Sequence, residues 1–128
     1  GWVSMFRSTF RELMDSNTKE KIQKIAETTG TIDLKNSLNY FYGHINLDSI
    51  LDLFKKRCQS MNVQLRIIPI NTSIKIIIQH DLGKNWPFFI IKQMNSILNE
   101  IEYRIINEDY NSQGFSFEII KIGDEHKT

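Results

Sequence analysis

The stretch that decides the fold is Val63-Gln64-Leu65-Arg66-Ile67, followed closely by Ile74-Lys75-Ile76-Ile77-Ile78-Gln79. In both runs an aliphatic residue recurs at every second position, which is typical of a β-strand with one buried face. A short turn-forming segment, residues 69–73, lies between them and predicts an antiparallel hairpin. The two-residue period begins only after residue 62, so we expect a helical first half and a mixed second half.

Beyond the hairpin, apolar residues return to helical spacing between Trp86 and Ile105, which predicts a long helix capped by Asn85. Residues 107–114 are expected to form a polar loop, residues 115–122 a third strand and residues 123–128 a flexible tail. A strand that follows a crossover helix is expected to run parallel to the strand before it.

Four amphipathic helices are predicted in the first half. Asn17 is expected to begin the second helix and Gly30 to end it, while Asp33 and Asn46 are expected to cap the third and fourth. The predicted fold is therefore α+β: one domain, 1–122, with a helical N-terminal half, a three-stranded mixed sheet in the order β-β-α-β, and a long C-terminal helix.

Composition excludes several classes of function. Sixteen basic and fifteen acidic residues give a net charge of +1, whereas a dedicated nucleic-acid domain carries a basic excess. We therefore expect no direct nucleic-acid contact and no binding to membranes, since no apolar run approaches the ~18 residues of a membrane span. Cys58 is the single cysteine, which favours a reducing, cytoplasmic location. Because the chain starts at Gly1 without an initiator Met, we expect a preceding region in the full protein.

The dipeptide His80-Asp81 is the most conspicuous polar motif. Such a pair occurs in metal-dependent phosphohydrolases, so a small metal- or phosphate-dependent hydrolase is one interpretation. Those sites require further histidines, and nothing in the sequence brings His44 to His80. The favoured interpretation is a structural histidine at the rim of the core. We predict no catalytic residue, no metal site and no cofactor, and we interpret Cys58 as an inert core thiol.

Residues 83–85 lead from a strand into a helix N-terminus, where free backbone N–H groups favour an anion. His80, Lys84 and Asn85 would add donors, although plain helix capping explains the same residues. If a small-molecule or anion pocket exists, we expect His80, Lys84 and Trp86 at its mouth. Tyr42 and His44, from an aromatic cluster, are expected nearby.

The second face of the predicted sheet is too apolar for one layer of helices to cover. The residues concerned are Ile68, Ile70, Ile77, Ile120 and Ile122. Exposed apolar surface and bare strand edges are typical of partner surfaces, so we expect a homodimer formed through the sheet.

Residues 76–86 read Ile-Ile-Ile-Gln-His-Asp-Leu-Gly-Lys-Asn-Trp. This segment resembles uncharacterised archaeal domains that follow a ribbon-helix-helix DNA-binding segment, and the helical lead at residues 6–30 is also similar. The resemblance implies a C-terminal dimerisation or signal-sensing domain of a transcriptional regulator. Pro87 departs from the serine often found there.

These observations together predict a non-catalytic regulatory domain that pairs with itself and senses a small ligand. The hydrolase using His80 and Asp81 and a purely structural dimerisation module remain the alternatives.

Overall fold

A computed structural model of the chain describes residues 11–124. Residues 11–16 are helical, and nine further elements follow. In chain order they are α2 (Lys19–Ile25), the π-turn η1 (Ala26–Gly30), α3 (Thr31–Tyr42), α4 (Leu47–Ser60), β1 (Gln64–Ile70), β2 (Ser73–Gln79), α5 (Trp86–Glu100), β3 (Tyr103–Asn111) and β4 (Gly114–Lys121).

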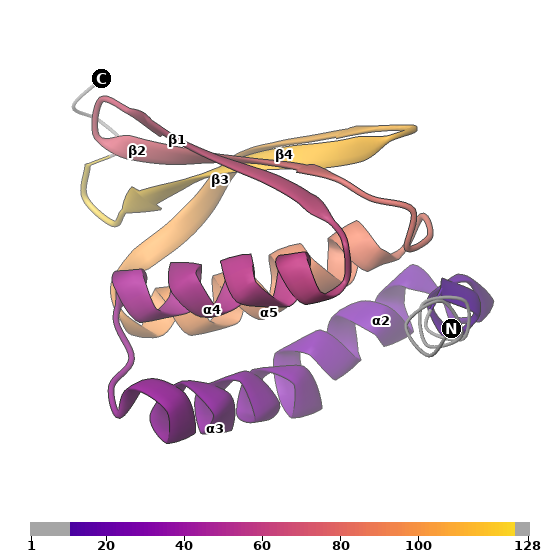
Figure 1. Cartoon of the computed structure of the whole chain (residues 1–128), viewed down its shortest axis with the longest axis horizontal. Coiled ribbons are helices and arrows are strands. Elements are labelled where there is room, and N and C mark those ends of the chain that lie inside the picture. The colour runs from indigo at the N-terminus through magenta and orange to yellow at the C-terminus, as the bar shows by residue number, and fades with distance from the viewer. Residues whose placement is uncertain (1–10, 125–128) are drawn as a thin grey trace.

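The elements form three layers, which Figure 1 shows from the side. The sheet is the first layer, α4 and α5 both lie beneath it, and α2 and α3 form the outermost layer. The core fills the space between the sheet and the two middle helices, where Ile76, Ile78 and Phe117 are fully enclosed. The opposite face of the sheet carries no helix in Figure 1.

The sheet has four strands in the order β1-β2-β4-β3, and every neighbouring pair is antiparallel. The predicted three-stranded mixed sheet is therefore wrong, although the α+β class and the first hairpin are correct. The strand expected to lie parallel to β2 is β4, and it pairs with β2 in the antiparallel sense. Pro69, assigned to a turn, lies within the edge strand β1, where a residue without an N–H is tolerated.

The second error lies at the end of α5. This helix ends at Glu100, not near Ile105, and the predicted long C-terminal helix is followed by two strands. Glu102 has a left-handed backbone (φ 65°), which ends the helical path and turns the chain into β3. Most of the segment expected to be a polar loop, residues 107–114, belongs to β3 and to its turn into β4.

The helix ends are partly as expected. Asn46 caps α4 with a reciprocal pair of hydrogen bonds to Ser49, which confirms that prediction. The N-cap of α2 is Thr18 and not the predicted Asn17. Gly30 does not end a helix, because α2 and α3 are joined without interruption through η1.

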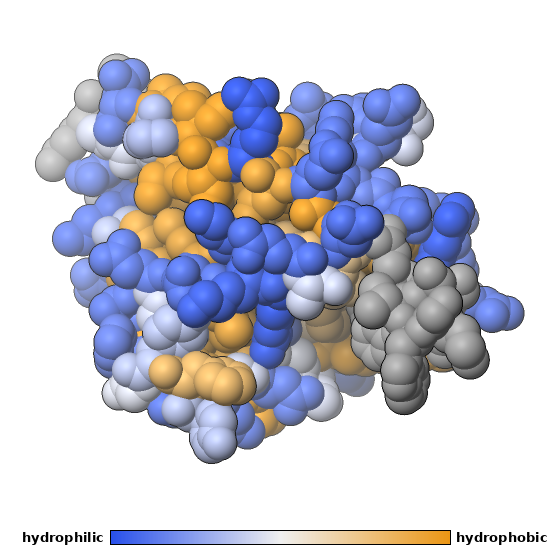
Figure 2. Space-filling model, viewed as in Figure 1, coloured by the Kyte–Doolittle hydropathy of each residue, from blue (hydrophilic) through white to orange (hydrophobic). Residues whose placement is uncertain are grey.

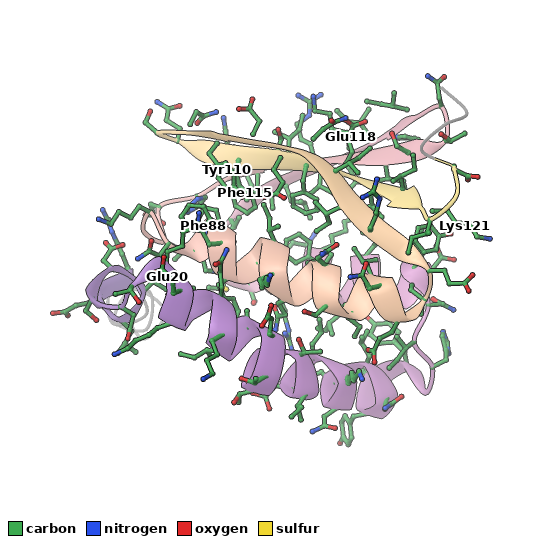
Figure 3. All side chains as sticks on the ribbon, turned by 180° about the vertical axis from the view of Figure 1, so that it is seen from behind. Glu20, Phe88, Tyr110, Phe115, Glu118 and Lys121 are labelled. Carbon is green, nitrogen blue, oxygen red and sulfur yellow. The ribbon has the colours of Figure 1, made fainter. Side chains whose placement is uncertain are left out.

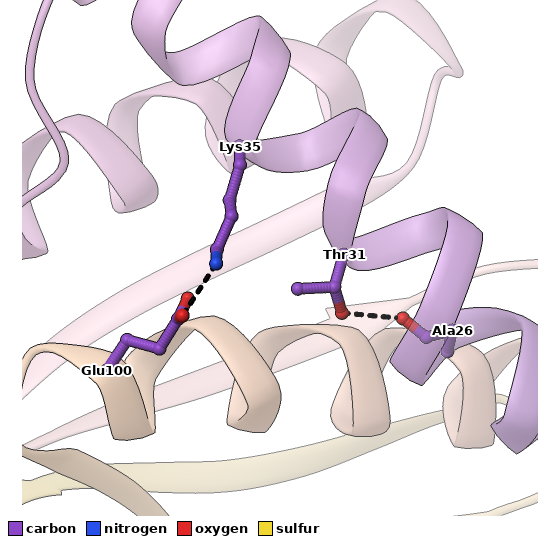
Figure 4. Close-up of polar contacts among 4 residues, drawn as sticks. All are labelled: Ala26, Thr31, Lys35 and Glu100. Carbon is purple, nitrogen blue, oxygen red and sulfur yellow. Dashed lines mark hydrogen bonds and ion pairs between the residues drawn. The ribbon is translucent and has the colours of Figure 1, made fainter.

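The π-turn explains why no cap is needed at Asp33. In η1 the helix is one residue wider than an α-turn, and the Thr31 hydroxyl donates to the Ala26 carbonyl at 2.7 Å (Figure 4). The Lys35 ammonium of α3 lies 2.5 Å from the Glu100 carboxylate at the end of α5, which ties the outer and middle layers together.

The face of the sheet that no helix covers exposes less apolar surface than predicted. Ile70 and Ile122 are exposed and Ile68 and Ile77 are half-buried, but Ile120, on the central strand β4, is 1% exposed. Charged side chains interrupt this face, and Glu118 stands on it in Figure 3. Of the predicted tail, residues 125–128 lie outside the described part of the chain.

Candidate functional site

Four of the predicted site residues are neighbours in the connection between β2 and α5. His80 and Lys84 line an open pocket of about 360 Å³, here called the loop pocket. Its lining residues are Arg11, His80, Asp81, Gly83, Lys84, Pro87, Phe88, Tyr110, Asn111, Ser112 and Gly114. Phe88 and Tyr110 form its aromatic wall, with ring centroids 5.2 Å apart (Figure 3).

His80 lies half-buried at the rim of the core, where strand alternation predicts it. Its Nδ1 accepts a hydrogen bond from the backbone N–H of Leu82 at 3.0 Å. Its ring lies 4.8 Å from Trp86 and 5.5 Å from Phe115. Burial lowers the pKa of His80 below its ordinary value, and the nearby charge of Asp81 opposes that shift only in part. The imidazole is therefore neutral near pH 7, and its proton lies on Nε2.

The place expected to attract an anion already contains a carboxylate of this chain. Asp15 accepts a hydrogen bond from the Lys84 backbone N–H at 3.2 Å. Gly83 has a left-handed backbone (φ 96°), and a Cβ there would lie 2.5 Å from the Asp15 Oδ1. A larger residue at this position would have a strained backbone and would displace the carboxylate. The Asp15 carboxylate thus takes the position at the start of α5 that would favour a bound anion.

Asn85 and Trp86 point away from the loop pocket. Asn85 occupies the N-cap position, but its side chain makes no capping bond. Its amide instead donates to the backbone carbonyls of Met14 and Asn17, at 3.0 and 2.9 Å. Trp86 is buried against His80 and Phe115. The predicted start of the helix, with Asn85 at the N-cap position before Trp86, is confirmed, but the capping bond is not formed, because the Asn85 amide donates to the N-terminal helical segment.

Tyr42 and His44 lie at the other end of the molecule. The connection between α3 and α4 is on the left of Figure 1, whereas the connection between β2 and α5 is on the right. Tyr42 donates to the Asp52 carboxylate at 2.5 Å, and Lys56 lies 2.9 Å from the same carboxylate. The hydrogen bond between Tyr42 and Asp52 lowers the pKa of Asp52 and raises the pKa of Tyr42, and Lys56 lowers the pKa of Asp52 further. The structure does not bring this group together with His80.

A second cavity, of about 300 Å³, lies among α3, α4 and α5 and is here called the interhelical cavity. Most of its lining is apolar. The apolar side chains are Leu34, Ile50, Phe54, Cys58, Met61, Trp86, Phe89, Ile90 and Met94. Its remaining lining residues are Gly30, Asp33, Arg57 and Gln93. An apolar pocket with a few convergent polar groups is the usual form of a small-molecule site.

Gln93 is the buried polar group of the interhelical cavity, with 7% of its surface exposed. Its Nε2 donates to the Gly30 carbonyl in the π-turn at 2.8 Å. A Cβ at Gly30 would lie 3.3 Å from the Phe89 ring and 3.4 Å from this Nε2, so the glycine permits the close approach. Asp33 is exposed, and the half-buried Arg57 donates to the Ser37 hydroxyl at 2.9 Å.

Cys58 lies on the apolar stripe of α4, as the sequence predicts, and is buried. Burial raises the pKa of its thiol to about 12. A thiol with this pKa remains protonated at neutral pH and is a poor nucleophile, which supports the interpretation of a packing residue.

The sequence contains one signal for the interhelical cavity that our interpretation missed. Gln93 stands within the apolar stripe of α5, three residues after Ile90 and four before Ile97. A polar residue at a stripe position is expected to be buried, and a buried amide requires partners. The spacing around Gly30 instead predicts a helix end, which hides its role at the cavity.

Within residues 11–124, no helix is both long enough and apolar enough to cross a membrane. The same residues contain no group of three or more His, Cys, Asp or Glu side chains that could hold a metal ion. Comparisons of the chain with models of protein families, with curated proteins and with solved structures found no match.

Proposed function

We propose that this chain is a non-catalytic regulatory domain that binds a small, mainly apolar molecule in the interhelical cavity. The observation that carries the proposal is the apolar cavity itself, whose lining includes the buried amide of Gln93. Its volume is that of roughly ten water molecules, so it suits a compact ligand. Because three helices contribute walls, a ligand there would stabilise their mutual packing.

The loop pocket is the weaker candidate for this role. Its predicted anion position is filled by Asp15, and the Nδ1 of His80 is occupied by the Leu82 N–H. Both interactions stabilise the connection between β2 and α5 without any ligand. A hydrolase that uses His80 and Asp81 would need His80 to leave its aromatic neighbours, so we favour the interhelical cavity.

Thermal unfolding in the presence of small apolar molecules tests the proposal. A ligand that binds only the native state at 100 times its Kd adds about 2.7 kcal/mol of stability, which would raise Tm by roughly 10 °C. We expect compact aromatic compounds such as toluene and indole to raise Tm.

A cavity-filling variant supplies the control for that experiment. Leu34→Phe places extra volume in the interhelical cavity, and we expect it to abolish the effect of these compounds on Tm. Leu13→Phe adds the same volume at an exposed position and should retain it. If neither toluene nor indole raises Tm, or if Leu34→Phe binds them as well as the wild type does, the proposal is wrong.

A second candidate function, homodimerisation, is favoured by a different observation. Figure 2 shows hydrophobic surface gathered between the β1–β2 hairpin and α4. Leu65 and Ile67 lie on the helix-facing side of β1, and Leu47 and Leu51 are half-buried on α4. Ile67 is 37% exposed, although its cross-strand partner Ile76 is fully buried. β1 is also an edge strand, so a second copy of the chain could cover both the edge and this surface.

The proposal extends to location and context. A buried, unpaired thiol at Cys58 fits a reducing compartment such as the cytoplasm. If the resemblance of residues 76–86 to the archaeal regulator domains holds, the response of this domain would be passed to a DNA-binding segment elsewhere in the protein.

A further inference from the structure

Only one of the two polar atoms of the Gln93 amide makes a hydrogen bond with the described residues. Its Nε2 donates to the Gly30 carbonyl, whereas its Oε1 accepts no hydrogen bond from the described residues. Among those residues, no side-chain nitrogen or oxygen is both fully enclosed and without a partner. Because Gln93 lines the interhelical cavity and only 7% of its surface is exposed, its Oε1 is the acceptor of this amide that remains available to a ligand there.

The surroundings of this acceptor favour a neutral partner. Leu34, Phe89 and Met94 line the same space and supply no charge. The two charged residues of the cavity, Asp33 and Arg57, are of opposite sign, and Asp33 is exposed while Arg57 is half-buried. A ligand charge placed among these apolar side chains would lose its hydration, and the opposite charges of Asp33 and Arg57 together supply no net counter-charge, which is unfavourable.

The position of the acceptor is fixed from two sides. The hydrogen bond to Gly30 holds the amide against the π-turn, and π-turns are frequent at functional sites. The ring of Phe89 lies against Gly30 next to this amide. A fixed acceptor discriminates between ligands better than a mobile one, because its partner must present a donor at one place.

We propose that the ligand of the interhelical cavity is a neutral, flat, mainly apolar molecule of about ten non-hydrogen atoms that donates one hydrogen bond to Gln93 Oε1. This inference rests on the proposed function and adds the chemical class of the ligand to it. Aromatic molecules with a single N–H or O–H, such as indoles and phenols, belong to this class.

Isothermal titration with indole and with benzofuran tests the inference. The two molecules have the same size and shape, but only indole carries an N–H donor. We expect indole to bind the wild-type protein about tenfold more tightly, which corresponds to one hydrogen bond inside a protein. Gln93→Leu removes the acceptor and should reduce the ratio of the two Kd values to about one. Gln59→Leu makes the same change at an exposed position of α4 and should preserve the ratio.

The possible failures are distinguishable. Equal Kd values for indole and benzofuran in the wild type would overturn this inference and leave the cavity proposal intact. Tighter binding of indole-3-carboxylate than of indole would overturn the neutral class. If neither indole nor benzofuran binds, the proposed function fails together with the inference. The comparison in the wild type remains decisive even if Gln93→Leu does not fold.

Discussion

His80 is a residue at which burial and hydrogen bonding act on the same imidazole. Burial against Trp86 and Phe115 lowers its pKa below 6.5, and the Leu82 N–H occupies Nδ1. The folded protein therefore prefers the neutral ring more than the unfolded chain does. Its contribution to stability is complete above pH 6.5 and is lost as the pH falls through the lowered pKa of the folded state.

We predict that His80→Asn weakens this pH dependence. The asparagine oxygen can still accept from the Leu82 N–H, because an Asx-turn uses the same spacing, but it does not titrate. The free energy of unfolding, measured with urea between pH 8 and pH 5, should decline less in the variant than in the wild type. His44→Asn, at an exposed position, is the matched control and should keep the wild-type slope. A slope unchanged by His80→Asn would contradict this account.

At the scale of elements, one amide connects the start of the chain to α5. The Asn85 side chain donates to two carbonyls, those of Met14 and Asn17, at the end of the helical segment 11–16. The Asp15 carboxylate reinforces this contact through the Lys84 N–H. The N-terminal segment is thus held at the point where α5 begins.

Substitutions at Asn85 separate this role from helix capping. An aspartate is as good an N-cap as asparagine, but it cannot donate to the two carbonyls. We therefore expect Asn85→Asp and Asn85→Ala to lower the free energy of unfolding by similar amounts, about 1–3 kcal/mol each. Asn46→Asp, at the true cap of α4, should cost less than Asn46→Ala. Chemical denaturation measures all four variants, and a mild effect of Asn85→Asp would show that capping dominates.

The limits of prediction are clearest in α5 and β3. The apolar stripe of α5 continues through Ile101 to Ile105 at helical spacing, and no Gly or Pro interrupts it. Periodicity alone could not show that the helix ends at Glu100, because the left-handed turn is made by Glu102, a residue without a special turn preference. The hairpin of β1 and β2 was predictable because its signals are local.

Apolar surface is exposed on one part of the molecule, where it favours self-association. The helical layers protect one face of the sheet, while the β1 edge and the apolar surface between β1 and α4 remain open (Figures 1 and 2). Exposed apolar surface beside an edge strand is a typical site of self-association.

We predict that the protein dimerises and that Ile67→Lys weakens the dimer about tenfold or more, because an unpaired charge would be buried at the interface. Sedimentation velocity over a wide range of concentrations measures this change. Ile32→Lys, at an exposed position on α3, is the matched control and should leave association unchanged. A wild-type protein that remains monomeric at high concentration would refute the dimer.

The candidate site shows why local motifs were insufficient at this scale. The residues from His80 to Trp86 are adjacent in sequence, so their proximity was predictable, although their hydrogen bonds were not. Gly30, Arg57 and Gln93 lie on three helices far apart in the chain, and only tertiary packing brings them to one cavity. No sequence pattern within a single element predicts that these three residues lie close together.

The π-turn at Ala26–Gly30 has a consequence for how the outer helix tolerates changes in length. Each residue advances an α-helix by about 100°. The π-turn contains one residue more than an α-helical turn, so this extra residue does not rotate α2 relative to α3. Deleting a single residue there would restore a regular helix but twist α2 out of phase with α3, which would carry Ile22 away from the interior. The π-turn therefore determines the rotation of α2 about its axis, and with it the side of α2 that faces α5.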